Sequence, residues 1–320
     1  MDSEGDSPTR QEVIRGRIDT YFDLFSRTLE LSEQLIPARS HGHEVLILLC
    51  SRLDALASSA FREGYPNRKA FVDFVTGYGR RRNLLQSISV GDLYHELAYH
   101  RWFLPTTIPK PGRLNRFSRV DDPILTLLVQ SDIPLTERDA DRLLGGIMRA
   151  LRETFRVMPG QPLSKRHLAT RNDVVNEITK AFDSPRKRNI AEALPQALGH
   201  LLDAKKMATI LYEKFRSEAI HGARVQLDNR RFFRDSDPYW VPRYSESVAS
   251  YLLAEFPARF LVNLLSDCIK TYRRHLISKG VLPADIIYAI FEDDFLAFID
   301  LLDEEMLPEY GAVQFRLEKR

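Results

Sequence analysis

The chain has 320 residues, of which 44% are hydrophobic, so it is long enough for one large domain or two with a substantial core. The formal net charge is only +2, so the total charge does not indicate a class of partner. Two cysteines, Cys50 and Cys268, lie among apolar residues far apart in the sequence, so we expect both to be small buried side chains, as fits a reducing compartment. No apolar run approaches the roughly 18 residues of a membrane span, and residues 1–10 do not resemble a signal peptide, so we expect a cytoplasmic protein with no membrane partner.

After a tail at residues 1–10 that we expect to be disordered, apolar residues recur at helical spacing over residues 11–36. Pro37 and the polar turn that follows it are expected to end this helix. A second apolar stripe predicts a helix over residues 44–63. Together, residues 11–63 are predicted to form the first antiparallel hairpin of a helical bundle.

Residues 64–195 are predicted to be a helical insertion or subdomain, separated by breaks rich in proline and glycine. No strand alternation is evident, which favours an all-α fold class: an antiparallel helical bundle with a helical elaboration. The region contains a predicted loop at 104–123, and its predicted helices lie at 67–78, 92–103, 136–155, 170–182 and 187–192.

Residues 196–320 are predicted to contribute the remaining bundle helices. A helix over residues 197–223 is followed by a loop at 225–242 and a long helix over 245–277, kinked at Pro257. Gly280 is expected to cap that helix. The chain is predicted to end with a helix at 283–306 and a short edge strand at 312–317.

The most informative stretch lies at the end of the helix predicted at 197–223, where Arg216 and His221 are followed by Gly222. On an ideal helix the two side chains point about 140° apart. Imidazole can exchange a proton near neutral pH, and guanidinium binds phosphate through a planar fork. The pair therefore suits metal-independent cleavage of an RNA phosphodiester. The alternative is that Arg216 is a surface charge and His221 a cation beside a helix C-terminus.

The segment Leu211-Tyr-Glu-Lys-Phe-Arg216-Ser-Glu-Ala-Ile-His221-Gly222 resembles the Arg-x(4–6)-His signature of the HEPN superfamily. The resemblance implies a helical bundle, a homodimer that brings two such helices together, and metal-independent endoribonuclease activity with no cofactor. It also implies a role in prokaryotic defence or toxin–antitoxin biology, with an antitoxin or regulatory partner. Ser217 stands where the family commonly has Asn, Asp or His, and it lies at i, i+4 from His221, where it could orient the imidazole.

Further residues are candidates for the same site. Asp54, inside the helix predicted at 44–63, either lies at the edge of the apolar stripe or pairs with Arg216 or His221. RNA-binding candidates are Tyr212, Arg224, Arg230, Arg231 and Arg234.

The last three of these arginines are interleaved with aromatic residues. Phe232, Phe233, Tyr239 and Trp240 either stack on RNA bases or fill the core beneath the loop. Two other basic clusters, at residues 80–82 and 186–188, are interpreted as solvated surface.

No other motif supports a competing chemistry. His95 and His100 are five residues apart, whereas a zinc-protease helix places its two histidines four apart, so we expect no metal site. Gly77-Tyr-Gly79 lacks the residues of a phosphate-binding loop. Two alternatives to a ribonuclease remain: a catalytically weak HEPN protein that binds RNA, nucleotide or a partner, and a helical scaffold in which Arg216 and His221 are structural.

Overall fold

The described part of the chain is predominantly helical, with two antiparallel two-stranded sheets. It divides into two compact units. Unit 1 comprises residues 1–82, 212–234 and 258–320, and unit 2 comprises residues 83–211 and 235–257. The computed structural model describes residues 9–38, 41–61, 65–97, 137–155, 167–180, 198–199, 201–213, 229–245 and 248–283.

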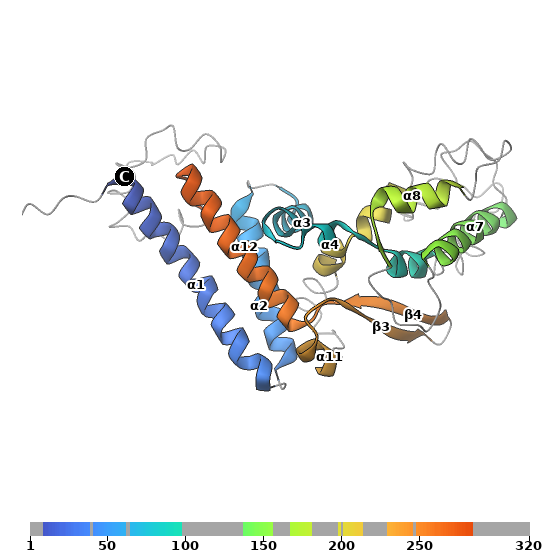
Figure 1. The fold of residues 1–320 in the computed structure, drawn as a ribbon, viewed down its shortest axis with the longest axis horizontal. Helices are drawn as coiled ribbons and strands as arrows, with labels where there is room; N and C mark the ends of the chain where they lie inside the picture. Colours follow the sequence, from blue (N-terminus) through green and yellow to red (C-terminus); the bar gives the residue numbers. More distant parts are fainter. Residues whose placement is uncertain are drawn as a thin grey trace, which may run out of the picture. The chain divides into compact units, whose positions relative to one another are not determined.

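Unit 1 is a helical bundle whose helices come from distant parts of the sequence. Its helices are α1 (Arg10–Ala38), α2 (Gly42–Ala60), α3 (Asn67–Tyr78), α11 (Asn229–Arg234) and α12 (Ala258–Lys279). In Figure 1, α1 and α12 lie side by side and run in opposite directions, and α2 packs against both. The first three helices confirm the predictions at 11–36, 44–63 and 67–78, except that α1 begins at Arg10, inside the predicted tail, and continues through Pro37, which was expected to end it.

Local hydrogen bonds fix the ends of the two longest helices. The Thr9 and Glu12 side chains accept hydrogen bonds from each other's backbone N–H in a capping box that begins α1. The bonds that the Thr9 N–H and, second, the Thr9 hydroxyl donate to the Glu12 carboxylate lower the pKa of Glu12. At the end of α12, Gly280 has φ +64°. Gly280 N–H donates to the Ile277 carbonyl and Val281 N–H to the Leu276 carbonyl, so the predicted cap is confirmed as a Schellman motif.

Tyr272 of α12 is the central contact of this bundle, with 1% of its surface exposed. Its ring centroid lies 5.9 Å from that of Phe22 in α1, and 5.5 and 5.1 Å from those of Phe74 and Tyr78 in α3. Its hydroxyl donates to the Ser59 carbonyl of α2 at 3.2 Å. One side chain therefore contacts the other three long helices of unit 1.

The two cysteines are buried in unit 1, as predicted. Burial, followed by the charge of Asp54, raises the pKa of Cys50 to about 12. Burial also raises the pKa of Cys268, with a smaller contribution from Asp267. A thiol with such a raised pKa stays protonated at neutral pH, so both cysteines serve as small core residues.

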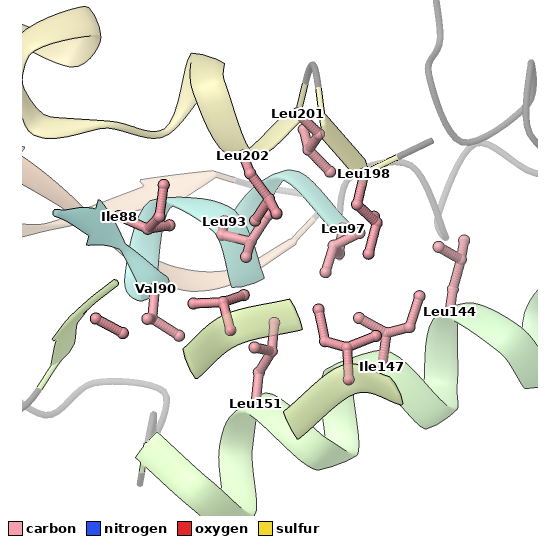
Figure 2. Packing of buried hydrophobic residues seen from close by; sticks show 13 residues of the cluster. Ile88, Val90, Leu93, Leu97, Leu144, Ile147, Leu151, Leu198, Leu201 and Leu202 are labelled. Atoms are coloured by element: carbon pink, nitrogen blue, oxygen red, sulfur yellow. The ribbon is translucent and has the colours of Figure 1, made fainter. Parts of the chain in front are cut away.

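Unit 2 has its own hydrophobic core (Figure 2). The sheet formed by β1 (Ile88–Ser89) and β2 (Leu168–Ala169) borders a helical segment at 90–97. Aliphatic side chains from this segment meet those of α7 (Glu137–Phe155) and α8 (Arg171–Lys180). Further leucines come from residues 198–202. The predicted helices at 136–155 and 170–182 are confirmed, and that at 92–103 is confirmed as far as residue 97.

A β-hairpin replaces part of two predicted elements. Strands β3 (Tyr239–Ser245) and β4 (Val248–Glu255) pair antiparallel, with Trp240 opposite Ala254. The loop predicted at 225–242 is therefore wrong over residues 239–242, and it is also wrong over 229–234, where α11 forms. The helix predicted at 245–277 is wrong over residues 248–255, and α12 begins only at Ala258, so Pro257 precedes this helix and does not kink it. Residues 248–255 form a strand despite the helical spacing of their apolar residues, because their backbone pairs with β3, which is rich in aromatic residues.

The unit boundaries at 82/83 and 211/212 differ from the boundaries at 63/64 and 195/196 that the sequence suggested. Two other groups of predictions lie outside the described residues. These are the loop at 104–123 and helix at 187–192, and the C-terminal elements at 283–306 and 312–317.

Tyr272 should be decisive for the stability of unit 1. We expect Tyr272→Ala to lower the free energy of unfolding by about 3–5 kcal/mol, because it leaves a cavity among four helices. Tyr272→Phe should cost about 1 kcal/mol, since it removes only the hydrogen bond to Ser59. Chemical denaturation followed by circular dichroism measures both, with the exposed Asn263→Ala as control. Equal stability of Tyr272→Ala and Asn263→Ala would contradict this role.

Candidate functional site

The residues that carry the predicted chemistry fall in one segment. We call residues 214–228 the motif segment. It contains Arg216, Ser217, His221 and Arg224 and lies outside the described part of the chain, so the catalytic and binding roles of these residues stay predictions. The structure does describe the chain on both sides of this segment. It also describes Asp54, Tyr212, Arg231 and Arg234.

The helix predicted at 197–223 is interrupted before it reaches the motif. Residues 201–204 are helical, Lys206 is extended, and α10 (Met207–Ile210) starts a new helix. The cause is pairing with β1. Ser89 N–H donates to the Lys205 carbonyl at 2.9 Å, and Met207 N–H donates to the Ser87 carbonyl at 3.0 Å. The prediction of one continuous helix is therefore wrong, because the Lys205 carbonyl and the Met207 N–H bond to the backbone on either side of Ile88.

Immediately before the motif, the chain is attached to α3. Residues 211–213 form a π-helical turn. Tyr212 is 8% exposed, and its ring centroid lies 5.4 Å from that of Phe71. The Glu213 carboxylate lies 3.0 Å from the Arg68 guanidinium in an exposed pair, which contributes at most about 1 kcal/mol. Burial of the Tyr212 ring shows that it helps to hold the start of the motif segment on unit 1, whereas its contact with RNA stays a prediction.

After the motif, the described chain resumes at α11, which packs against α2 and α12. Phe232 and Phe233 are buried, as are Tyr239 and Trp240 farther along the chain. Of the two interpretations of these aromatic residues, core filling is therefore the correct one. They are not available as stacking platforms for bases.

The arginines around α11 differ in accessibility. Arg234 is exposed and Arg231 is half-buried. The side chain of Arg230 is outside the described part of the structure. Arg231 and Arg234 are thus the members of this cluster that the structure leaves at least partly open to solvent.

Asp54 lies half-buried on α2, one helical turn from Cys50. Its charge contributes to the raised pKa of Cys50, which places the carboxylate close to the bundle core. This position agrees with the edge of the apolar stripe. The alternative pairing with Arg216 or His221 stays a prediction, because both lie outside the described residues.

Sequence reasoning missed a buried carboxylate in unit 2. Asp92 is 4% exposed, and one of its oxygens, Oδ2, accepts from Ser89 Oγ at 2.5 Å and from Ala254 N–H at 3.3 Å. Trp240 Nε1–H in turn donates to Ser89 Oγ at 3.3 Å. Ser89-x-x-Asp92 before an apolar run is a helix-start pattern that was present in the sequence, although here the Ser89 N–H bonds the Lys205 carbonyl and only the Ser89 hydroxyl reaches Asp92. The network attaches the hairpin to the helix at 90–97, which is a structural role.

The described ranges contain neither a metal-binding cluster nor a membrane-spanning helix. No group of three or more His, Cys, Asp or Glu residues there is arranged to hold a metal ion. Within the same ranges, no helix has the length and apolar character needed to cross a membrane. Comparison of the chain with models of known protein families, with curated proteins and with solved structures found no match.

Replacing Asp92 should loosen the hairpin of unit 2. We expect Asp92→Ala to lower the free energy of unfolding by about 1–3 kcal/mol, because the Ala254 N–H loses a buried acceptor. Asp92→Asn keeps one oxygen acceptor and should cost less. Thermal melts followed in the near-ultraviolet, where Trp240 contributes, compare both with Glu153→Ala, an exposed change in α7. A melt of Asp92→Ala that matches Glu153→Ala would refute the proposed anchoring.

Proposed function

We propose that this chain is a metal-independent endoribonuclease of the HEPN type that acts as a homodimer. The observation that carries the proposal is the segment Arg216-Ser-Glu-Ala-Ile-His221-Gly222, which joins a phosphate-binding cation to a proton-transfer group at a spacing typical of that family. The proposed setting is prokaryotic defence or toxin–antitoxin biology in the cytoplasm, under an antitoxin or other regulatory partner.

The proposed reaction is an internal displacement at phosphorus. The RNA 2′-oxygen attacks the adjacent phosphorus, its proton passes to a base, and the bond to the 5′-oxygen breaks with protonation of the leaving group. The products are a 2′,3′-cyclic phosphate and a free 5′-hydroxyl. His221 supplies one of the two proton transfers. Arg216 stabilises the charge that develops on the non-bridging oxygens, and Ser217 orients the imidazole.

Three observations on the described residues support this proposal. The chain is predominantly helical, and unit 1 is a helical bundle. Both ends of the motif segment belong to this bundle, through Tyr212 on α3 and through α11 on α2 and α12. Arg231, which is half-buried, and Arg234, which is exposed, follow the segment closely, and guanidinium groups are suited to binding RNA phosphates.

The dimer follows from the number of donors that the transition state needs. A single motif segment offers one Arg216 and one His221 to a phosphate with several charged oxygens. A two-fold axis through the motif segments would double these donors in one cleft. Asp54, on α2 of the same bundle, is the proposed positioning residue for this pair.

Ser217 favours a second candidate function. A serine hydroxyl orients an imidazole less strongly than the carboxylate or amide found in many members of the family. A catalytically weak HEPN protein that binds RNA, nucleotide or a partner would tolerate this change. Such a protein would retain RNA affinity while cleaving slowly.

Cleavage should be independent of divalent metal. With His221 and Arg216 performing the proton transfer and charge stabilisation, we expect RNA cleavage to persist in EDTA and to leave 2′,3′-cyclic phosphate ends. Gel analysis of end-labelled RNA, with and without phosphatase treatment of the 3′ ends, detects these products. Complete loss of cleavage on chelation, reversed by Mg²⁺ or Mn²⁺, would exclude this mechanism.

Substitutions should separate catalysis from folding. His221→Ala should slow cleavage by roughly 10²- to 10⁴-fold, and Arg216→Ala by at least as much. Arg216→Lys should restore only part of the rate, since an ammonium lacks the planar fork. Both alanine variants should unfold within about 1 kcal/mol of the parent protein.

Leu53→Ala is the control for folding, because Leu53 is fully buried on α2 and its truncation should cost roughly 2–5 kcal/mol. Thermal melts and cleavage rates are measured on the same proteins. Undiminished cleavage by His221→Ala would rule out its catalytic role. A melt as poor as that of Leu53→Ala would favour the helical scaffold instead.

A further inference from the structure

The solvent face of α12 carries a row of positive charges. Arg259, Lys270 and Arg274 are all exposed, and on an ideal helix they project within about 60° of one another. Asn263 is exposed within the same arc. From Arg259 to Arg274 the row extends about 22 Å, at a rise of about 1.5 Å per residue. We call these four residues the basic stripe.

The stripe is bordered by charged contacts on both sides. On the α1 side, Arg273 Nε donates to Asp19 Oδ1 at 2.8 Å. On the α3 side, the Arg80 Nε lies 3.4 Å from Asp267 Oδ1, and the Arg81 guanidinium lies 5.4 Å from the centroid of the Phe260 ring. Two carboxylates are thus engaged at the borders of the stripe, and additional guanidinium groups extend its positive field toward α3.

The charge of the stripe is not balanced within the described part of unit 1. Among the residues described, none forms an ion pair with Arg259, Lys270 or Arg274. The whole of α12 contains five Lys or Arg residues against a single carboxylate, Asp267. Since the chain as a whole has a net charge of only +2, this helix concentrates positive charge on one surface.

An ordinary solvated helix face differs from this arrangement. Exposed faces of soluble helices commonly intersperse both signs, with acidic and basic residues at i, i+4. Here Lys270 and Arg274 are themselves at i, i+4, a spacing at which like charges repel and destabilise the helix. A polyanion on this surface would relieve that repulsion by bringing phosphate charge to several cations at once.

We propose that the basic stripe binds the sugar–phosphate backbone of single-stranded RNA. The choice of RNA as the polyanion rests on the proposed ribonuclease function. An anionic lipid surface fits less well, because a membrane-binding helix needs several apolar side chains beside its cations, and Ile277 is the large apolar residue exposed on the described part of this helix. The stripe would hold the backbone without reading sequence, leaving cleavage to the motif segment.

Binding can be tested without cleavage by using a single-stranded 2′-O-methyl oligonucleotide, which lacks the attacking hydroxyl. Fluorescence anisotropy with the full chain gives Kd over a range of salt concentrations. The test variant combines Arg259→Gln, Lys270→Gln and Arg274→Gln. We expect roughly 10- to 100-fold weaker binding near physiological salt. The slope of log affinity against log salt should become less negative by about 2, since each phosphate contact on a single strand contributes about 0.7.

The matched control removes the same charge elsewhere, through Arg27→Gln on α1 with Arg149→Gln and Arg152→Gln on α7, three exposed positions. It should change Kd by less than about twofold, in keeping with loss of long-range charge that salt screens. Both variants should melt within a few degrees of the parent. Equal effects of the two variants on affinity and on the salt slope would overturn the proposal.

The two proposals fail in different ways. Stripe-dependent binding without any cleavage of natural RNA would reject the ribonuclease and keep the stripe as an RNA-binding surface. Cleavage of natural RNA, with oligonucleotide affinity insensitive to the stripe, would reject the stripe alone. The stripe variant is also tested for binding to vesicles of anionic phospholipid. If it loses vesicle binding while its RNA affinity is unchanged, the RNA-binding proposal for the stripe is overturned in favour of a membrane surface.

Discussion

Burial of Tyr272 is the constraint on which unit 1 depends. A phenol that is removed from water must find an acceptor, and this one uses the Ser59 carbonyl near the end of α2, where helix carbonyls lack partners within the helix. The Ser59 hydroxyl accepts in turn from Tyr21 of α1 at 2.9 Å. Aromatic rings from α1 and α3 enclose the Tyr272 ring. The bundle therefore closes only when α12, nearly 200 residues later in the chain, joins the first three long helices.

The chain is divided between the two units. Although α3 and α12 pack together, the chain between them leaves unit 1 after residue 82 and builds unit 2 with its own core. It returns at residue 212, passes through α11, and leaves again for the β3–β4 hairpin before α12. The motif segment at 214–228 is the link between the first return and α11. Its two ends are therefore attached to the bundle by buried aromatic side chains.

Elements with strong local signals were predictable from sequence. Apolar periodicity and caps predicted α1, α2, α3, α7 and α8 to within a few residues. Two elements were not predictable, because non-local partners decided them. Residues 248–255 have apolar side chains compatible with a helix but pair with β3, and Lys206 is drawn out of a helix by β1. Backbone pairing of this kind leaves little trace in the periodicity of one strand.

The candidate site shows the same limit. Phe232 and Trp240 carry the composition of a base-stacking surface, and only their burial, at 0% and 5% exposure, assigns them to the core. Asp92 was marked in the sequence by a Ser-x-x-Asp pattern at a helix start, yet its contact with Ala254 depends on a residue 162 positions away. The chemistry of Arg216 and His221, in contrast, is a property of the side chains and their spacing, which the sequence alone supplies.

Helix α12 connects the stability of the bundle with its surface chemistry. Tyr272 and Arg274 are two residues apart, so the helical period turns one inward to the core and the other outward to solvent. Charge can thus accumulate on the outer face of α12 at little cost to the packing on its inner face. Helix α11 packs against the same α12 directly after the motif segment. A polyanion held along the outside of α12 would consequently be bound to the unit that contains residues 212–234, as the proposed nuclease activity would require.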